Sequence, residues 1–169
     1  MNIKFAKLRE DAVIPSKRDE DAGYDIYPCF EDNFIKLMPH ETKGIPTGII
    51  SAFDMDYVAI IKERGSTGIR GMGVRAGVID SGYRGEWFVA ITNHNDVPLY
   101  ISKDISDTQD EECIVYDYKK AIAQAVFLIV PKLVVEETSV EVVEKYESAR
   151  GKKCLGSTND NYSFELSDL

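Results

Sequence analysis

Short segments rich in β-branched and aromatic residues recur every ~8–12 residues along this chain, and this spacing constrains the fold more than any other feature. Turn-forming Gly, Pro, Asn and Asp residues separate them. Residues 1–9 alternate apolar and polar side chains, which predicts a strand with one buried face. The pattern favours an all-β sandwich, barrel or jelly roll over alternating strands and helices. The other strands are predicted at 21–28, 33–38, 42–50, 57–62, 86–93, 112–118 and 140–147, with a strongly apolar stretch at 122–135 and a single turn at 51–55.

Length and charge limit the possible functions. With 169 residues, 44% of them hydrophobic, the chain can form one domain with a core and is too short to predict two. The net charge of −9 argues against nucleic acid as a partner, because duplex binding needs a basic face. There is neither a leader-like segment nor an apolar run near the ~20 residues of a membrane span, so we expect a cytoplasmic protein with no membrane association. The cysteines lack metal-ligand spacing, which suits free thiols.

A glycine-rich stretch at 77–86 is the strongest candidate for a functional site. It places Asp80 and Tyr83 among three glycines, where backbone turns sharply or approaches another group closely. Asp80 could orient a water molecule and accept its proton, or it could cap the turn. Tyr83 could stack on a sugar or a base, or it could cover part of the core.

Two further segments have the composition of anion-binding loops. Residues 62–71 combine Arg64, Gly65 and Ser66 with closely spaced glycines, and residues 150–158 repeat that combination. Backbone N–H groups, hydroxyls and an Arg fork suit a phosphate, which offers only acceptors and negative charge. Each segment alone could be a plain turn. Together they indicate two ends of a polyphosphate site, where a hard divalent cation would neutralise the phosphate oxygens.

The remaining features concern the second half of the chain. Gln124 lies in a strongly apolar stretch, so it either ties core backbone groups together or faces a site. Residues 95–118 are polar and acidic, and we interpret them as a long hairpin or surface excursion, either a solvated loop or an element that binds a partner. We predict a β domain at 1–147 and a flexible C-terminal arm at 148–169, because the arm lacks apolar surface.

Taken in order, these segments resemble the five motifs of the homotrimeric dUTPase (dUTP diphosphatase) family. The resemblance implies a single-domain, jelly-roll-like β fold of the β-clip type. It also implies hydrolysis of dUTP to dUMP and pyrophosphate, in a homotrimer with active sites at the subunit interfaces and Mg²⁺ held mainly by the substrate triphosphate. The third motif is nearly complete and the most specific. The five motifs match at 21–25, 64–66, 77–85, 123–124 and 150–158.

The resemblance assigns roles to individual residues. Asp80 would activate the water that attacks the α-phosphorus, and Asp25 would support the site. Tyr83 would pack on the deoxyribose, and backbone groups from Val74 to Val78 would read the uracil edge. The side chains expected at the phosphates are Arg64, Ser66 and Gln124, with Arg150, Ser157 and Thr158 over the γ end. The other residues expected to bind substrate are Gly65, Gly77, Ile79, Leu155 and Gly156.

Four positions depart from the family pattern. Gly65 stands where Ser usually follows Arg, and Ala121 stands where an Arg is usual, which would remove a structural ion pair. Leu155 replaces an aromatic residue expected to stack on uracil, a loss that could weaken binding by ~1–3 kcal/mol. Asn159 replaces a closing glycine. We therefore expect activity with weaker nucleotide capture or a looser closure of the arm.

Two other functions fit parts of the pattern. A dCTP deaminase of similar fold needs a carboxylate for deamination, and Glu86 is a candidate. Release of ammonia from dCTP, rather than pyrophosphate from dUTP, would identify that enzyme. A regulatory protein could instead use the dUTPase scaffold and bind a partner through the acidic residues 95–118. Unchanged interactions after deletion of 103–117 would exclude that role.

Overall fold

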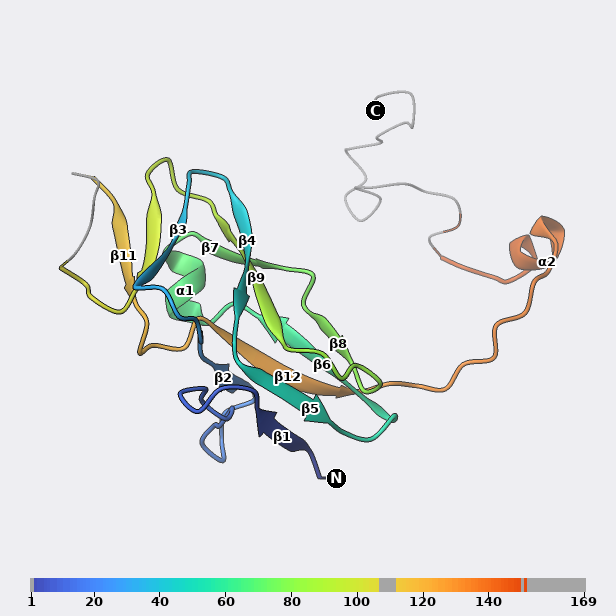
Figure 1. Cartoon of the computed structure of the whole chain (residues 1–169). Coiled ribbons are helices and arrows are strands. Elements are labelled where there is room, and N and C mark those ends of the chain that lie inside the picture. Colours follow the sequence, from blue (N-terminus) through green and yellow to red (C-terminus); the bar gives the residue numbers. More distant parts are fainter. Residues whose placement is uncertain (1, 107–111, 150, 152–169) are drawn as a thin grey trace. The chain divides into compact units, whose positions relative to one another are not determined.

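The computed structural model describes residues 2–106, 112–149 and 151, and it divides the chain into two compact units, Met1–Lys132 and Leu133–Leu169 (Figure 1). Each unit is considered by itself. The first is built mostly of β-strands, as the sequence predicts. Its elements are β1 (Lys4–Lys7), β2 (Tyr24–Ile26), β3 (Phe34–Leu37), β4 (Thr42–Pro46), β5 (Ile49–Ala52), β6 (Tyr57–Lys62), α1 (Gly65–Ile69), β7 (Met72–Arg75), β8 (Val78–Asp80), β9 (Phe88–Asn93), β10 (Leu99–Ser102), β11 (Ile114–Asp117) and β12 (Ala123–Ile129).

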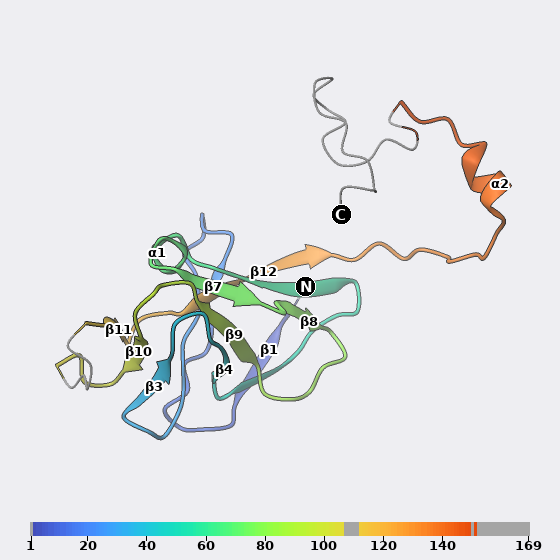
Figure 2. The ribbon, with the colours of Figure 1, turned by 90° about the horizontal axis from the view of Figure 1, so that it is seen from above.

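The strands of the first unit form small sheets (Figure 2). The largest of those formed by the described residues has the strand order β2-β12-β6-β8, and the others have the orders β4-β9-β7, β11-β10-β3 and β1-β5. The longest ladder joins β12 to β6 in antiparallel register, from Gln124 opposite Lys62 to Ile129 opposite Tyr57. On its other edge β12 pairs with β2, which places Asp25 opposite Gln124.

The core is centred on Trp87, which is fully buried just before β9. Its indole N–H donates a hydrogen bond to the Ser51 hydroxyl at 3.1 Å, and its carbonyl accepts one from Thr47 at 2.6 Å. The ring of Phe5 packs edge-on against it at 5.5 Å. β9 follows Trp87 as the middle strand of its sheet. Trp87 thus ties β1, β5 and β9 together.

The segment from β7 through β8 to Glu86, which is called the hairpin below although β7 and β8 belong to different sheets, crosses from one sheet to another. β7 pairs with β9, whereas β8 pairs with β6. Gly77 lies at the crossing point, where its carbonyl accepts a hydrogen bond from the Ile61 N–H at 2.7 Å. A Cβ atom at Gly77 would collide with the Ile61 carbonyl, so the close approach of the two backbones requires glycine.

Several local predictions are wrong in detail. Residues 42–50 form two strands rather than one, because Gly48 takes a positive φ of 66° and bends the chain between β4 and β5. The turn predicted at 51–55 begins later, since Ser51 and Ala52 still belong to β5. In the second unit, the strand predicted at 140–147 is instead the helix α2 (Val140–Glu144). Its valines favour a strand, but a strand forms only with a partner.

The acidic stretch 95–118 is not a simple surface excursion. Its two ends form β10 and β11, which pair in parallel rather than as a hairpin. Leu99, Ile101 and Tyr116 from these strands are buried in the core. Residues 107–111 lie outside the described part of the chain. Deletion of 103–117 would therefore remove a core strand, and a test of partner binding should be confined to 105–112.

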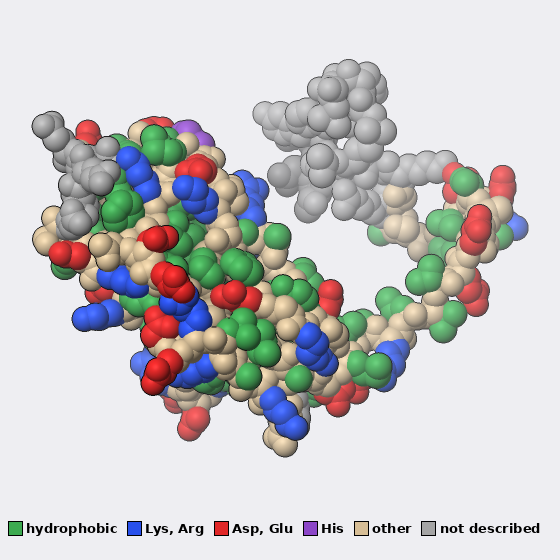
Figure 3. All heavy atoms as spheres, viewed as in Figure 1, with side chains coloured by type: hydrophobic (Ala, Val, Ile, Leu, Met, Phe, Trp, Pro, Cys, Tyr) green, Lys and Arg blue, Asp and Glu red, His purple; other side chains and the backbone are tan. Residues whose placement is uncertain are grey.

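On the face of the first unit seen in Figure 3, basic and acidic side chains are interspersed with each other and with hydrophobic and other groups. None of the helices in the described parts of the chain is long and apolar enough to cross a membrane.

Substitution of Gly77 by Ala should lower the free energy of unfolding by roughly 1–3 kcal/mol, because the added methyl group forces β8 away from β6. Gly82 is the matched control in the same hairpin, since a Cβ atom there meets nothing within 4 Å. Gly82→Ala should change stability by less than ~0.5 kcal/mol. Urea unfolding of both variants measures the difference, and equal stabilities would contradict the close approach at Gly77.

Candidate active site

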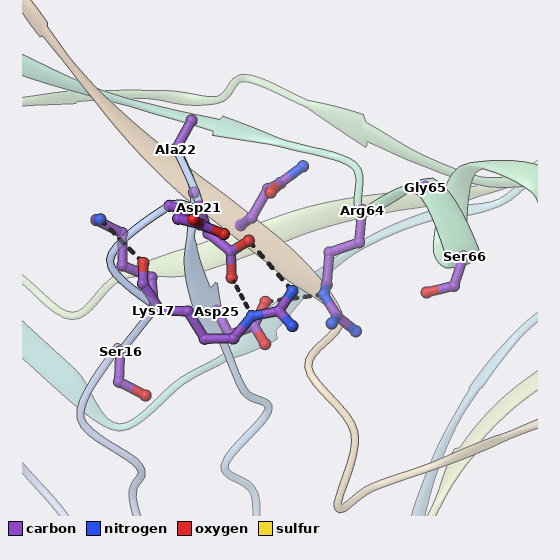
Figure 4. A pocket seen from close by; sticks show the side chains of 12 residues that line it. Ser16, Lys17, Asp21, Ala22, Asp25, Arg64, Gly65 and Ser66 are labelled. Atoms are coloured by element: carbon purple, nitrogen blue, oxygen red, sulfur yellow. Dashed lines mark hydrogen bonds and ion pairs between the residues drawn. The ribbon is translucent and has the colours of Figure 1, made fainter.

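A cavity of about 750 Å³ opens where the loop before β2, the start of α1 and the start of β12 meet (Figure 4). It gathers residues from three of the predicted motifs, which lie up to about a hundred positions apart in the sequence. Its lining consists of Ser16, Lys17, Arg18, Glu20, Asp21, Ala22, Gly23, Asp25, Arg64, Gly65, Ser66 and Gln124. The first, second and fourth motifs therefore contribute to one polar site.

The strand register explains why these residues meet. Asp25 lies opposite Gln124 on one side of β12, and Lys62 lies opposite Gln124 on the other side. The Gln124 side chain donates a hydrogen bond to the Glu63 carbonyl at 2.8 Å, directly before Arg64. Gly23 packs so tightly on the Gln124 side chain that a Cβ atom would collide with it. Gln124 thus both ties backbone together and lines the cavity.

Arg64 is held in place from several directions. Its Nε donates to a carboxylate oxygen of Asp25 at 2.8 Å, and the two side chains are 33% and 31% exposed. It is also the residue that precedes α1, where the buried Thr67 hydroxyl accepts from the Arg64 N–H and donates to the Arg64 carbonyl, both at 3.0 Å. Asp25 therefore orients the guanidinium of Arg64.

Gly65 and Ser66 follow as the first residues of α1, and both line the cavity. Figure 4 shows the Ser66 side chain on the same side as the Arg64 guanidinium. The first N–H groups of a helix have no partner within the helix. The serine, although shifted by one position relative to the family pattern, therefore still places a hydroxyl and helix-start amides at the cavity. The sequence did not predict the helix.

The loop before β2 adds charged residues that the sequence analysis did not assign to the site. Arg18 forms a two-pronged ion pair with Asp21, at 2.8 and 3.2 Å. The guanidinium beside it holds the pKa of Asp21 below its ordinary value, so that carboxyl group is ionised. The available signal was the run of charges directly before the first motif. The lining then balances in sign, with Lys17, Arg18 and Arg64 against Glu20, Asp21 and Asp25.

The third motif lies elsewhere in the same chain. The described residues that line the cavity do not include any from 77–86. Asp80 pairs with Val58, four positions along β6 from Lys62, which is a separation of roughly 13 Å. Figures 1 and 2 show α1 and β8 well apart from each other. Asp80, Val78 and Tyr83 are exposed there.

Within the hairpin, two polar groups already have partners. The Tyr83 hydroxyl donates to the Glu86 carbonyl at 2.9 Å, which holds the ring against the turn. The Glu86 carboxylate accepts the Gly48 N–H at 2.7 Å, and this contact ties the hairpin to the bend between β4 and β5. Glu86 therefore has a structural role in this fold.

Glu63 links the cavity to the hairpin, and the sequence analysis did not single it out. Its carboxylate accepts the N–H of Val74 at 2.8 Å, at the point where the hairpin leaves β7. This backbone hydrogen bond is the main cause of a lowered pKa for Glu63. Because the Val74 N–H is occupied, reading of a base by residues 74–78 would fall to other backbone groups. No pattern of spacing identifies such a contact.

Five of the predicted substrate-binding residues lie outside the described residues. They are Arg150, Leu155, Gly156, Ser157 and Thr158. The described part of the chain contains no cluster of three or more His, Cys, Asp or Glu side chains arranged to hold a metal ion.

The fold and the cavity define a mostly β-strand protein with a polar cavity. The family model described as dUTPase matches residues 9–106. The deoxyuridine 5'-triphosphate nucleotidohydrolases of Nautilia profundicola and Clostridium novyi are each 35% identical over 162 residues, covering 94% of this chain and 99% of each relative. The chain therefore belongs to the dUTPase family.

Solved structures agree with this assignment at the level of the fold. A mutant dUTPase of Staphylococcus bacteriophage 80alpha, with dUpNHpp, superimposes with a TM-score of 0.72 at 20% identity, covering 93% of this chain and 98% of that one. The predicted dUTPase fold is confirmed.

Glu63→Gln should lower stability at pH 7 by roughly 0.5–1 kcal/mol, because a neutral amide is a weaker acceptor than a carboxylate for the Val74 N–H. The folded pKa of Glu63 lies below its ordinary value of 4.5. Its contribution is therefore complete above that value and is lost as the pH falls through the folded pKa. Urea unfolding of wild type and variant at pH 7 and at lower pH should show the difference shrinking. A difference that stays constant with pH would exclude this charge effect.

Proposed function

We propose that this chain hydrolyses dUTP to dUMP and pyrophosphate. The observation that carries the proposal is the convergence of Arg64, Ser66 and Gln124 on one cavity, beside Asp25, in a member of the dUTPase family. A guanidinium fork, a hydroxyl and helix-start amides are donors that match a triphosphate. The uracil, sugar and water are then assigned to the hairpin that carries Asp80.

The reaction needs a water molecule activated next to the α-phosphorus. Asp80 would accept the proton of that water as its oxygen attacks, and the bond to the β-phosphate would break with pyrophosphate as the leaving group. Tyr83, whose ring is fixed by its hydrogen bond to Glu86, would pack on the deoxyribose. Unoccupied backbone groups between Val74 and Val78 would read the uracil edge.

The site is completed by a second copy of the chain in a homotrimer. The support is geometric, because Asp80 and the phosphate-binding cavity lie roughly 13 Å apart along β6 in one chain. In that arrangement Asp80 does not line the cavity that would hold the phosphates. A symmetric assembly that places the hairpin of one copy over the cavity of another brings the two together.

Mg²⁺ would be bound chiefly by the triphosphate. Mg²⁺ sites commonly use substrate phosphates with one or two carboxylates, rather than a cage made of protein. The cavity fits that mode, because its carboxylates Asp21 and Asp25 already pair with arginines. When bound, the cation neutralises charge on the phosphate oxygens.

The arm would complete the substrate site. Its residues Arg150, Ser157 and Thr158 would close over the γ end, with Leu155 near the base.

The alternative of a dCTP deaminase is weakened by Glu86. A carboxylate that acts on cytosine must be available to the base, whereas Glu86 accepts a backbone hydrogen bond from Gly48 at 2.7 Å. Release of pyrophosphate from dUTP without ammonia release from dCTP is the assay that separates the two enzymes.

Asp80→Asn should slow turnover of dUTP by ~10²–10⁴-fold, because the amide cannot accept the proton of the attacking water. The dissociation constant for a non-hydrolysable dUTP analogue should change by less than about 3-fold. Asp32→Asn, at an exposed site outside the cavity and the hairpin, is the control and should keep wild-type rates. Near-normal turnover of the Asp80 variant would rule out this base.

Mixing two inactive variants tests the shared site directly. Asp80→Asn and Arg64→Ala should each be inactive, yet co-expression in equal amounts should restore about a quarter of the sites, since each site draws the two residues from different copies. A mixture of Asp80→Asn with the double variant should restore none. Absence of recovery in the first mixture, with trimers verified by mass, would place the whole site in one chain.

A further inference from the structure

Ala121 occupies the position where the family pattern has an arginine, and its backbone carbonyl accepts hydrogen bonds from two side chains. The side chain of Tyr116 is buried, and its hydroxyl donates a hydrogen bond to the Ala121 carbonyl at 2.7 Å. The same carbonyl accepts Nη1 of Arg64 at 3.4 Å. The hydrogen bond from Arg64 depends on the direction of the Ala121 carbonyl. The shorter hydrogen bond from Tyr116 fixes that direction.

Tyr116 comes from β11, at the far end of the acidic stretch. Its place in the ladder is opposite Ile101 of β10, and both side chains are in the core. The guanidinium of Arg70 lies 5.9 Å from the centre of the Tyr116 ring. Arg64 and Arg70 are the residues that flank α1 on its two sides. Tyr116 therefore contacts the surroundings of α1 at both ends of the helix.

The hydroxyl of Tyr116 is protonated at neutral pH. Burial raises its pKa, against an opposing effect of the Arg64 and Arg70 guanidinium groups. A protonated hydroxyl can donate to the carbonyl and still offer its lone pairs toward the nearby Arg64. The carboxylate of Asp25, in β2, accepts a hydrogen bond from Nε of the same arginine.

We propose that Tyr116 is a positioning residue for Arg64, so that a strand of the acidic stretch helps to build the phosphate-binding site in place of the side chain absent at Ala121. This inference rests on the proposed role of Arg64 in binding the triphosphate. Asp25 and the Ala121 carbonyl then set the guanidinium plane from two sides. The acidic stretch thereby gains a role that does not require any partner protein.

Tyr116→Phe keeps the ring and removes the donor. The KM for dUTP and the dissociation constant for a non-hydrolysable analogue should rise by about 3–10-fold, while kcat changes by less than about 2-fold. Tyr118→Phe is the matched control from the same stretch, because its hydroxyl contacts Asp11 at 3.4 Å and not the cavity. It should behave as wild type. Unchanged KM and analogue binding in Tyr116→Phe would overturn the proposal.

A double-mutant cycle separates positioning from a general loss of stability. If Tyr116 acts through Arg64, Tyr116→Phe should weaken analogue binding in the wild type but have little further effect in an Arg64→Lys background. Additive losses would overturn the proposal. If Arg64→Lys alone binds the analogue as tightly as wild type, the assigned role of Arg64 fails instead, which distinguishes the two ideas.

A fluorinated tyrosine at position 116 covers the case in which Tyr116→Phe does not fold. It keeps the ring and the hydroxyl, and the hydroxyl ionises at a lower pH. Because an ionised hydroxyl cannot donate to the Ala121 carbonyl, KM should change with pH through that ionisation. The wild type should not show this step, because its hydroxyl stays protonated over the same pH range. Arg64, Arg70 and Asp25, the charged groups that face the ring, are common to both proteins and so cannot cause the difference. Identical pH profiles would overturn the proposal.

Discussion

The antiparallel pairing of β12 with β6 is the contact on which the site depends. It sets Gln124 opposite Lys62, and the pairing of β12 with β2 sets Asp25 opposite Gln124. Side chains alternate between the two faces of a strand, so a slip of one residue would turn Gln124 away from the cavity. Ala123 and Ala125, its neighbours in β12, are fully buried and hold that register. The geometry of the cavity follows from core packing.

The same strand, β6, connects the cavity with the segment that carries Asp80. Arg64 lies two positions after its last residue, Lys62, whereas Asp80 in β8 pairs with Val58 near its start. β8 is an edge strand, and the residues around Asp80 are exposed. An edge that carries a carboxylate, a tyrosine and an exposed Val78 is suited to contact with another copy. Stability of the single chain and completion of the active site therefore make different demands on this sheet.

Features marked by a strong local sequence signal were predictable, whereas weakly marked elements and pairings between distant segments were not. Glycine punctuation located the hairpin at Gly77, and an isolated Gln124 in an apolar run indicated a hydrogen-bonded polar group. The helix α1 was missed because Gly65 to Gly68 are weak helix formers, and the buried Thr67 stabilises it by capping. The parallel pairing of β10 with β11 has no local signal at all. The contacts of Glu63 and Tyr116 follow from those pairings.

The charge balance of the cavity shows what the binding of a triphosphate demands. Arg18 and Arg64 each already pair with a carboxylate, so the net charge of the lining does not attract an anion. Affinity must then come from donors fixed in advance, since an ordered guanidinium loses less conformational freedom on binding. The pairing with Asp25 orders Arg64 in this way. Under the proposed function, a cation on the substrate and the basic residues of the arm would supply the missing positive charge.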